Sequence, residues 1–396
     1  MNIEPIKTII KDELNIEEKQ KYEMIGEELI RNNNVAVCVL AGGQGTRLGH
    51  NGPKGTFIVE LKTPKSIFEI QVDSLKRAYD KFGVYTYLYV MTSKENDEET
   101  KRFFEDNDYF NYPKDKIAFF VQGEFPLTDR DKNELKDENG KLVLAPNGNG
   151  GIFKALEDEK ILDRLKENNI KYLVTQNVDN ILANPIDAIS LGILYSNKAE
   201  IGMKSIVKGY PDERVGNIVL KDGKPTVIEY IDFPKDLSEE RDENGELKYK
   251  EAHFGVNYLS IELLERISRE KLPIHEALKS NEKYGNFIKY EMFIFDGFEK
   301  AKNGLVVRVR REDEFAPIKN KEGQDSPKTA IMLYNDKFRQ LKCCETPVFM
   351  RFLRVFRNIF KIYIKKYCKI VKSCIKYGCE YGKIFGNGNV PNKLIT

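Results

Sequence analysis

The chain has 396 residues, of which 41% are hydrophobic and 32% are charged, and its formal net charge is only +2. This composition is ordinary for a globular protein of two or three domains and gives no general reason to expect a nucleic-acid partner. The charged N-terminus lacks a signal-peptide core, and no uncharged run reaches 18 residues, so we expect a cytoplasmic protein without a spanning helix.

The first half of the chain alternates predicted strands and helices after a charged helix expected over 16–33. Apolar, β-branched runs predict strands over 35–41, 84–93, 117–123 and 171–180. Helical patterns cover 66–82, 95–107 and 151–168. Because this alternation indicates βαβ units with right-handed crossovers, we predict an α/β fold with a Rossmann-like, mostly parallel sheet. Ligands of such sheets bind beyond the carboxyl ends of the strands.

The second half has shorter elements and a different pattern. We expect a hairpin over 216–233 with its turn at Asp222-Gly223, an exposed charged loop over 235–251, a strand over 253–260, a helix over 291–302, and a strand with a charged loop over 304–315. This smaller, mixed region is expected to hold an acceptor substrate.

A glycine-rich loop follows the first buried strand, with LAGGQGTRLG over 40–49 and GPKG over 52–55. Four glycines in eight residues let main-chain N–H groups approach phosphate oxygens. Arg47 adds a forked donor and Lys54 a point charge. The spacing fits neither the dinucleotide fingerprint nor the P-loop. The alternative is a tight turn with solvated charges.

This loop resembles that of the UDP-sugar pyrophosphorylase family, and most closely its UDP-N-acetylglucosamine pyrophosphorylase branch. The resemblance continues in order through FFVQG (119–123), APNGNGG (145–151), NVDNIL (177–182), VIEY (227–230) and REDEFAPIKN (311–320). It covers roughly residues 35–330 and implies a GT-A-like nucleotidyltransferase domain. The implied substrates are UTP and a sugar 1-phosphate, and the implied products are a UDP-sugar and pyrophosphate.

The resemblance implies nucleotide contacts at the strand ends. The Gln122 amide can pair with the edge of uracil, and Gly148 lets the backbone lie against a flat base. Asp179 is well placed to hold Mg²⁺, or Mn²⁺ in its place, against phosphate oxygens, although an Asp there is often only a turn cap. The implied nucleotide-binding residues are Leu40, Ala41, Gly42, Gly43, Gln122, Gly148 and Asp179, with Asp179 as the metal ligand.

A second set of residues is expected to hold the sugar phosphate. Glu229 and Tyr230 match the family's sugar-contacting Glu-Tyr pair, and Asn149 matches a substrate-contacting position. Lys319 matches the lysine that contacts phosphate near the reacting centre. Without the resemblance, Asn149 could belong to a simple loop before the helix at 151, Glu229 could be decoration of the hairpin edge, and Lys319 could be a solvated lysine in a charged loop.

One departure from the family pattern affects the sugar. Where the family often has an Asn followed four residues later by a His, this chain has His253 and then Asn257. Both are expected near the acceptor, but a buried structural His253 remains an equal alternative. UDP-N-acetylglucosamine is the product that the resemblance favours, with UDP-glucose or UDP-N-acetylgalactosamine as alternatives.

The implied reaction is in-line attack of the sugar phosphate on the α-phosphorus of UTP. Catalysis then consists mostly of positioning and charge stabilisation, for which the resemblance implies Arg47, Lys54 and Lys319 as catalytic residues. A non-catalytic sugar-nucleotide-binding protein is the rival interpretation.

Three regions are expected along the chain: an N-terminal helical segment (1–33), a catalytic domain (34–330) with a nucleotide half (34–200) and a sugar half (201–330), and a basic tail (331–396). Residues 337–396 carry 14 Lys and Arg against two Glu. The stretch 346–378 predicts one amphipathic helix. Packing on the catalytic domain and peripheral adsorption to an anionic membrane both remain open for it.

Overall fold

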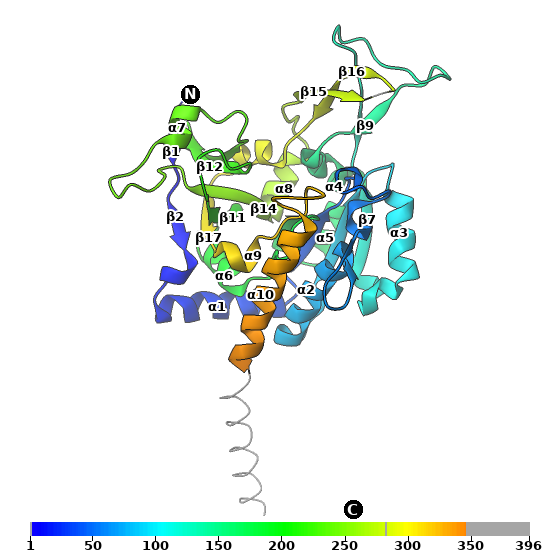
Figure 1. Ribbon diagram of the computed structural model, residues 1–396. Helices are drawn as coiled ribbons and strands as arrows, with labels where there is room; N and C mark the ends of the chain where they lie inside the picture. The colour runs from blue at the N-terminus through cyan, green and yellow to red at the C-terminus, as the bar shows by residue number, and fades with distance from the viewer. Residues whose placement is uncertain (1, 282, 346–396) are drawn as a thin grey trace, which may run out of the picture. The chain divides into compact units, whose positions relative to one another are not determined.

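In the computed structural model, residues 2–281 and 283–345 are described (Figure 1). The described residues up to Asn335 form one compact unit, and a second unit begins at Asp336. The predicted basic helix over 346–378 lies outside the described residues, and so do both interpretations of it. Within the described ranges, no helix is long and apolar enough to cross a membrane.

The core of the first unit is a mixed, mostly parallel sheet. Its main path runs β2 (Thr8–Ile10), β17 (Gly304–Arg308), β11 (Ile201–Val207), β14 (Glu251–Ser260), β10 (Tyr172–Asn177), β3 (Val35–Leu40), β6 (Tyr87–Thr92), β7 (Ile117–Val121). Only β14 on this path runs antiparallel to its neighbours. The predicted α/β fold is therefore confirmed.

The strands of the nucleotide half end together at one edge of the sheet. All six residues of β3 are buried, as its continuous apolar run predicts. In the parallel register, Leu40 is opposite Asn177 of β10 and Met91 of β6. The glycine-rich loop after Leu40 and the segment after Asn177 consequently leave the sheet side by side.

Strand β14 reaches the same edge of the sheet with its N-terminal end, because it runs in the opposite direction. It pairs antiparallel with β10, with Asn257 opposite Thr175. Because β14 runs backwards relative to β10, its early residues, including His253, lie beyond the carboxyl end of β10. This explains how a strand from the second half of the chain reaches the edge where the first half places its loops.

Helices flank the sheet, and their ends follow local sequence signals. Helix α1 (Ile16–Arg31) begins with a capping box formed by Asn15 and Glu18. Helix α2 (Ile67–Phe82) begins at the Ser66 cap and ends at Gly83, whose φ is +76°. The other helices of the half are α3 (Asp97–Asp106), α4 (Ile152–Asp158), α5 (Ile161–Glu167) and α6 (Ala188–Ser196).

Hairpins surround the second half of the sheet. The predicted hairpin is confirmed as β12 (Gly216–Lys221) and β13 (Lys224–Ile228), with Asp222 and Gly223 at φ +49° and +79°. A projecting arm combines β8 (Glu124–Pro126) and β9 (Leu144–Pro146) with β15 (His275–Asn281) and β16 (Gly285–Glu291). Figure 1 shows it above the body of the unit.

Several predicted elements differ from the observed ones. Within 1–33, predicted as helical, β1 (Ile3–Pro5) pairs with β12 and β2 pairs with β17, so the N-terminus completes the sheet. The single helix over 151–168 is two, because Lys160 adopts a left-handed conformation with φ +58°. The predicted helix over 291–302 is a 3₁₀ helix, Ile294–Lys300.

Other elements were not predicted at all. They include β11, α6, the arm hairpin β15–β16, α8 (Ile261–Ile267), and two short helices in the charged loops, α7 (Lys235–Glu239) and α9 (Arg311–Glu314). Of these, α7 and α9 have only five and four residues, too few to show a period.

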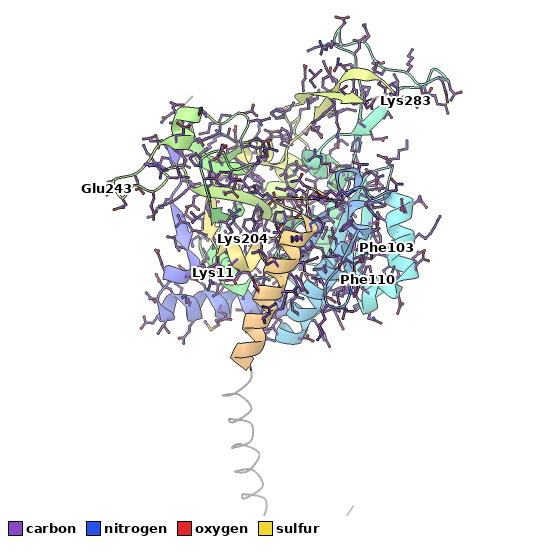
Figure 2. All side chains as sticks on the ribbon, viewed as in Figure 1. Lys11, Phe103, Phe110, Lys204, Glu243 and Lys283 are labelled. Carbon is purple, nitrogen blue, oxygen red and sulfur yellow. The ribbon has the colours of Figure 1, made fainter. Side chains whose placement is uncertain are left out.

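A buried ionic cluster joins three of these elements. The Lys204 side chain of β11 is fully buried, with its Nζ 3.0 Å from Asp187 Oδ2 and 2.7 Å from Glu314 Oε2 (Figure 2). Lys11 adds a second cation, 2.7 Å from Asp187 Oδ2. Burial by itself raises the pKa of Asp187, but the two lysines outweigh it and hold that pKa well below its usual range. The cluster fixes α9 against β11.

Glycines set the close crossing of α1 and α6. A Cβ at Gly192 would lie 1.8 Å from Tyr22 O, and one at Gly26 would lie 1.8 Å from Ala188 O.

We expect Gly192→Ala to lower the free energy of unfolding by about 1–3 kcal/mol, because the helices must separate. Urea unfolding measures this. The matched control is Gly209→Ala, whose added Cβ meets nothing closer than 3.6 Å. Equal midpoints for both variants would contradict the packing argument.

Candidate active site

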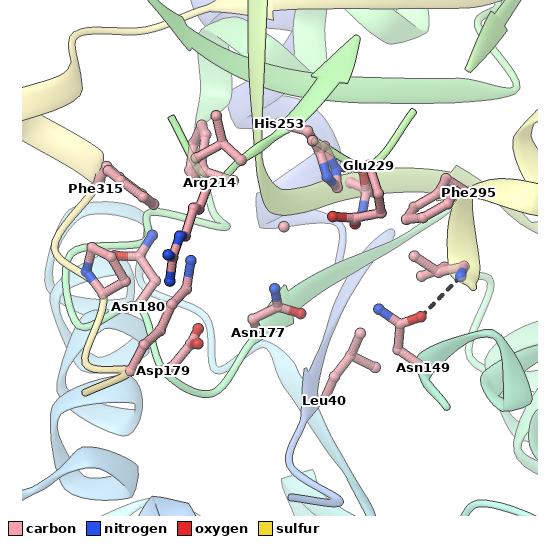
Figure 3. Close-up of a pocket in the computed structure, with 18 residues that line it drawn as sticks. Leu40, Asn149, Asn177, Asp179, Asn180, Arg214, Glu229, His253, Phe295 and Phe315 are labelled. Carbon is pink, nitrogen blue, oxygen red and sulfur yellow. Dashed lines mark hydrogen bonds between the residues drawn. The ribbon is translucent and has the colours of Figure 1, made fainter. Parts of the chain in front are cut away.

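Two adjoining cavities open at the edge where the strands end. The loop cavity, of about 390 Å³, is bordered by the glycine-rich loop and includes Gly42, Lys54 and Gln122. The hairpin cavity, of about 130 Å³, lies toward β12–β13 (Figure 3). Four residues line both: Leu40, Asn149, Asn177 and Asp179. The two cavities therefore meet at a carboxylate.

The glycine-rich loop is folded back on itself by backbone hydrogen bonds. Gly45 N donates to Gly52 O at 3.0 Å, and Lys54 N donates to Gly43 O at 3.1 Å. A side chain at position 42 would displace the Gln122 amide, because a Cβ there would lie 2.2 Å from Gln122 Nε2. Gly42 thus lets Gln122, which is itself buried, reach the wall of the loop cavity.

Lys54 and Asp179 face each other across the base of the cavities. Lys54 Nζ lies 3.3 Å from Asp179 Oδ2, and each side chain is 16% exposed. The residues come from the loop after β3 and the segment after β10, so the parallel register brings them together. Their opposite charges offset each other, and both remain accessible from the loop cavity.

Buried carboxamides hold the segment that carries Asp179. Gln71 of α2 donates from Nε2 to Val178 O at 3.1 Å and to Asn180 O at 3.0 Å, the two carbonyls that flank Asp179. Its Oε1 accepts a hydrogen bond from Gln176. Since Gln71 is only 4% exposed, these bonds form away from water, where an unsatisfied donor is costly.

Asn180 in turn holds the segment that carries Lys319. Asn180 Nδ2 donates to Glu314 O at 2.7 Å, and its Oδ1 accepts from Ala316 N at 2.9 Å. Ile318 N donates to Asp179 O at 2.9 Å. Lys319 consequently borders the hairpin cavity, with its Nζ 3.8 Å from Asp325.

The hairpin cavity has a polar wall. Burial raises the pKa of Glu229, and Lys319 partly opposes this effect. His253 Nε2 lies 2.7 Å from Asn257 Oδ1, while Asn257 Nδ2 donates to Thr175 Oγ1 at 3.2 Å. Asn257 therefore accepts through its oxygen, so neutral His253 carries its proton on Nε2 and keeps Nδ1 as an acceptor.

Most of the residues predicted from the sequence line the cavities. They are Leu40, Gly42, Gly43, Lys54, Gln122, Gly148, Asn149, Asp179, Glu229, His253, Asn257 and Lys319. His253 lines the hairpin cavity and also bonds to Asn257, so its contact with an acceptor stays a prediction.

Three predicted residues do not line either cavity. Arg47 is exposed on a short 3₁₀ helix, Thr46–Leu48, whose buried residue is Leu48. Ala41 is buried under the loop, 1% exposed. Tyr230 is 41% exposed and lines neither cavity, although the preceding Glu229 borders the hairpin cavity. Substrate contact at these positions stays a prediction.

Sequence reasoning missed several residues around the site. Gln71 could have been found, since it is a buried amide on the apolar face of α2, four residues after Ile67. Asn177 and Asn180 lie within the NVDNIL motif, close to Asp179, but only Asp179 was predicted as a site residue. Arg214 and the ion pair of Lys289 and Glu291 sit in segments with no motif.

Among the described residues, Asp179 is the one carboxylate that lines both cavities. No group of three or more His, Cys, Asp and Glu side chains that could hold a metal occurs among the described residues. Mg²⁺ commonly takes one or two carboxylates and completes its shell with phosphate and water. A carboxylate at this position is compatible with one magnesium contact, and the role of Asp179 as a metal ligand stays a prediction.

Comparisons with known proteins agree on one family. The model of the family described as UTP–glucose-1-phosphate uridylyltransferase matches residues 2–373. A Dictyostelium discoideum protein named "Probable UDP-N-acetylglucosamine pyrophosphorylase" is 37% identical over 346 residues, 80% of this chain and 71% of that protein. The UDP-N-acetylglucosamine pyrophosphorylase of Saccharomyces cerevisiae is 34% identical over 81% of this chain and 72% of its own length.

A solved structure supports the same match. The uridine diphosphate N-acetylglucosamine pyrophosphorylase from Trypanosoma brucei, in complex with an inhibitor, superposes with a TM-score of 0.78 at 30% identity. The match covers 87% of this chain and 76% of that one.

The buried imidazole predicts a pH-dependent stability. The unfolded chain protonates His253 near pH 6.5, whereas burial lowers the pKa of the folded imidazole to about 4. The unfolded state binds more protons between these values, so the free energy of unfolding falls as the pH is lowered through this window. The loss should be on the order of 3 kcal/mol. His253→Gln, which cannot titrate, should lack it. Parallel curves of unfolding free energy against pH for the two proteins would contradict this.

Proposed function

Because the chain belongs to the UTP–glucose-1-phosphate uridylyltransferase family, we propose that it transfers the uridylyl group of UTP to N-acetylglucosamine 1-phosphate. The family resemblance predicted from the sequence motifs is confirmed, and the chain is a nucleotidyltransferase that forms a UDP-sugar. The choice of N-acetylglucosamine is supported by the names of the relatives from Saccharomyces cerevisiae and Trypanosoma brucei.

The observation that carries the proposal is the meeting of two cavities at Asp179. A reaction between a nucleoside triphosphate and a sugar phosphate needs two sites whose phosphates converge. The loop cavity is lined by the glycine-rich loop and Lys54, and the hairpin cavity is lined by Lys319 and polar side chains. The α-phosphorus of UTP would then lie at their junction.

The loop cavity has the chemistry to hold uridine. Gln122 presents an amide, which can donate to and accept from one edge of uracil. Gly148 has φ +86°, and a Cβ there would lie 2.5 Å from Met292 O. Only glycine fits this turn, which leaves the cavity wall flat enough for a base.

The hairpin cavity has the chemistry to hold a sugar. Neutral His253 offers Nδ1 as an acceptor for a hydroxyl or amide hydrogen. Glu229, whose pKa is raised by burial, can accept from a hydroxyl as a carboxylate or donate when protonated. Asn149 lines both cavities, and its Oδ1 is fixed by Ile294 N at 3.0 Å.

The proposed reaction needs no protein nucleophile. A phosphate oxygen of the sugar phosphate forms a bond to the α-phosphorus while the bond from that phosphorus to the bridging oxygen breaks, and pyrophosphate leaves with the electron pair. Lys54 would stabilise charge on the triphosphate, and Lys319 would draw the acceptor phosphate toward the junction. Mg²⁺, bound at Asp179, would supply further charge stabilisation for the phosphate oxygens.

A pyrophosphate-release assay tests the substrate assignment. With UTP and Mg²⁺, we expect the highest kcat/KM for N-acetylglucosamine 1-phosphate. Glucose 1-phosphate and N-acetylgalactosamine 1-phosphate should be slower by about 10- to 200-fold, because modest changes in a pocket contact cost roughly 1–3 kcal/mol. A preference for glucose 1-phosphate would overturn the choice of sugar. Release with none of the three would overturn the function.

The residues at the junction should control the rate. We expect Lys54→Ala, Asp179→Ala and Lys319→Ala each to lower kcat/KM by about 10²–10³, with melting temperatures near that of the wild type. Lys235→Ala is the matched control, since its side chain is 88% exposed on α7. Near-normal turnover in all three junction variants would contradict the placement of the reacting phosphates.

A further inference from the structure

Arg214 extends into the hairpin cavity from a short, well-anchored loop. It lines that cavity together with Asp179 and Lys319, and Figure 3 shows its guanidinium directed toward Asp179. The neighbouring residues Glu213 and Val215 are 2% and 6% exposed. Because both neighbours point into the protein, the backbone between them directs Arg214 outward, into the cavity.

The loop that carries Arg214 is tied to the rest of the site. The Glu213 carboxylate accepts from Gly209 N at 2.7 Å and pairs with the guanidinium of Arg311 through both of its oxygens. Arg311 also donates to Val207 O at 3.2 Å. Since Arg311 begins α9 and Lys319 follows α9, this pairing links the backbone positions of Arg214 and Lys319.

Among the side chains that the structure describes, no carboxylate forms an ion pair with Arg214. Lys54 lies 3.3 Å from Asp179, Lys319 lies 3.8 Å from Asp325, and Lys289 lies 2.8 Å from Glu291. Over residues 2–281 and 283–339, whose side chains are described, no carboxylate lies within 4.0 Å of the Arg214 guanidinium. Most exposed arginines are simply solvated, but Arg214 faces the cavity that, under the proposed function, receives the sugar phosphate.

We propose that Arg214 binds the phosphate of the acceptor sugar 1-phosphate and holds it beside Lys319. This inference rests on the proposed function and adds a residue to its acceptor site. A guanidinium presents a planar fork that matches two phosphate oxygens, which a lysine cannot do. Arg214 lines the hairpin cavity and not the loop cavity, so it serves the acceptor and not the triphosphate.

Steady-state kinetics with both substrates varied test the assignment. Arg214→Met keeps the apolar stem and removes the charge. It should raise the KM for N-acetylglucosamine 1-phosphate by about 10- to 100-fold, the range for loss of a charge-assisted hydrogen bond, while the KM for UTP changes little. Arg214→Lys should give an intermediate value. The matched control is Arg241→Met, in the exposed loop of the second half, which should behave as the wild type.

Two outcomes would overturn the role of Arg214 while the proposed function stands. One is an unchanged KM for the sugar phosphate in Arg214→Met. The other is an increase in the KM for UTP as large as that for the sugar phosphate. A merely structural role would lower the melting temperature and the active fraction without separating the two substrates.

A binding measurement keeps the proposal testable without turnover. Calorimetric titration of N-acetylglucosamine 1-phosphate into the full chain should show binding that Arg214→Met weakens by about 10-fold or more. Equal affinities, or no binding to the wild type, would overturn the proposal. Binding that depends on Arg214 in a chain that releases no pyrophosphate would instead retain the phosphate site and reject the uridylyltransferase function.

Discussion

The site depends on the fixed position of the short segment Val178–Asn180. Gln71 donates to the carbonyls on both sides of Asp179, and Asn180 bonds the segment that leads to Lys319. The carboxylate at the end of β10 and the lysine that follows α9 are thereby placed by one continuous set of buried hydrogen bonds. Each of these amides would leave unsatisfied buried partners if removed, which costs about 1–3 kcal/mol per group. The cost of breaking these hydrogen bonds keeps Asp179 and Lys319 in fixed positions.

Ion pairs balance the charges around the junction of the two cavities, and one of these pairs is fully buried. Lys204 bonds Glu314, the residue just before Phe315, and so fixes the origin of the segment that carries Lys319. Breaking one partner of such a buried ion pair typically costs about 3–5 kcal/mol. Meanwhile Lys54 and Asp179 neutralise each other at the junction. Under the proposed function, a triphosphate with a metal ion would exchange for this pairing without leaving an isolated buried charge.

Much of the site could be predicted because its sequence signals are local. A buried strand, a glycine-rich loop and a strand-end Asp each appear within a few residues, and the parallel fold requires them to share an edge. The rest depends on long-range contacts. Nothing near His253 shows that β14 runs antiparallel to β10, and nothing near Arg214 shows which cavity it faces. Lys204 and Gln71 interrupt apolar patterns, yet Gln71 bonds Gln176, 105 residues away, and Lys204 pairs with Glu314, 110 residues away, as well as with the nearer Asp187. The strands at the N-terminus were missed because three-residue strands show no period.

The central claim is that UTP binds in the loop cavity with its phosphates at Asp179. A crystal structure of the chain with UTP and Mg²⁺ tests it most directly. We expect uracil against Gly148 and Gln122, the triphosphate along the glycine-rich loop, and the metal between Asp179 and the phosphate oxygens, with Lys54 turned from the carboxylate toward the nucleotide. A nucleotide bound elsewhere, or one whose phosphates lie far from Asp179, would contradict the account.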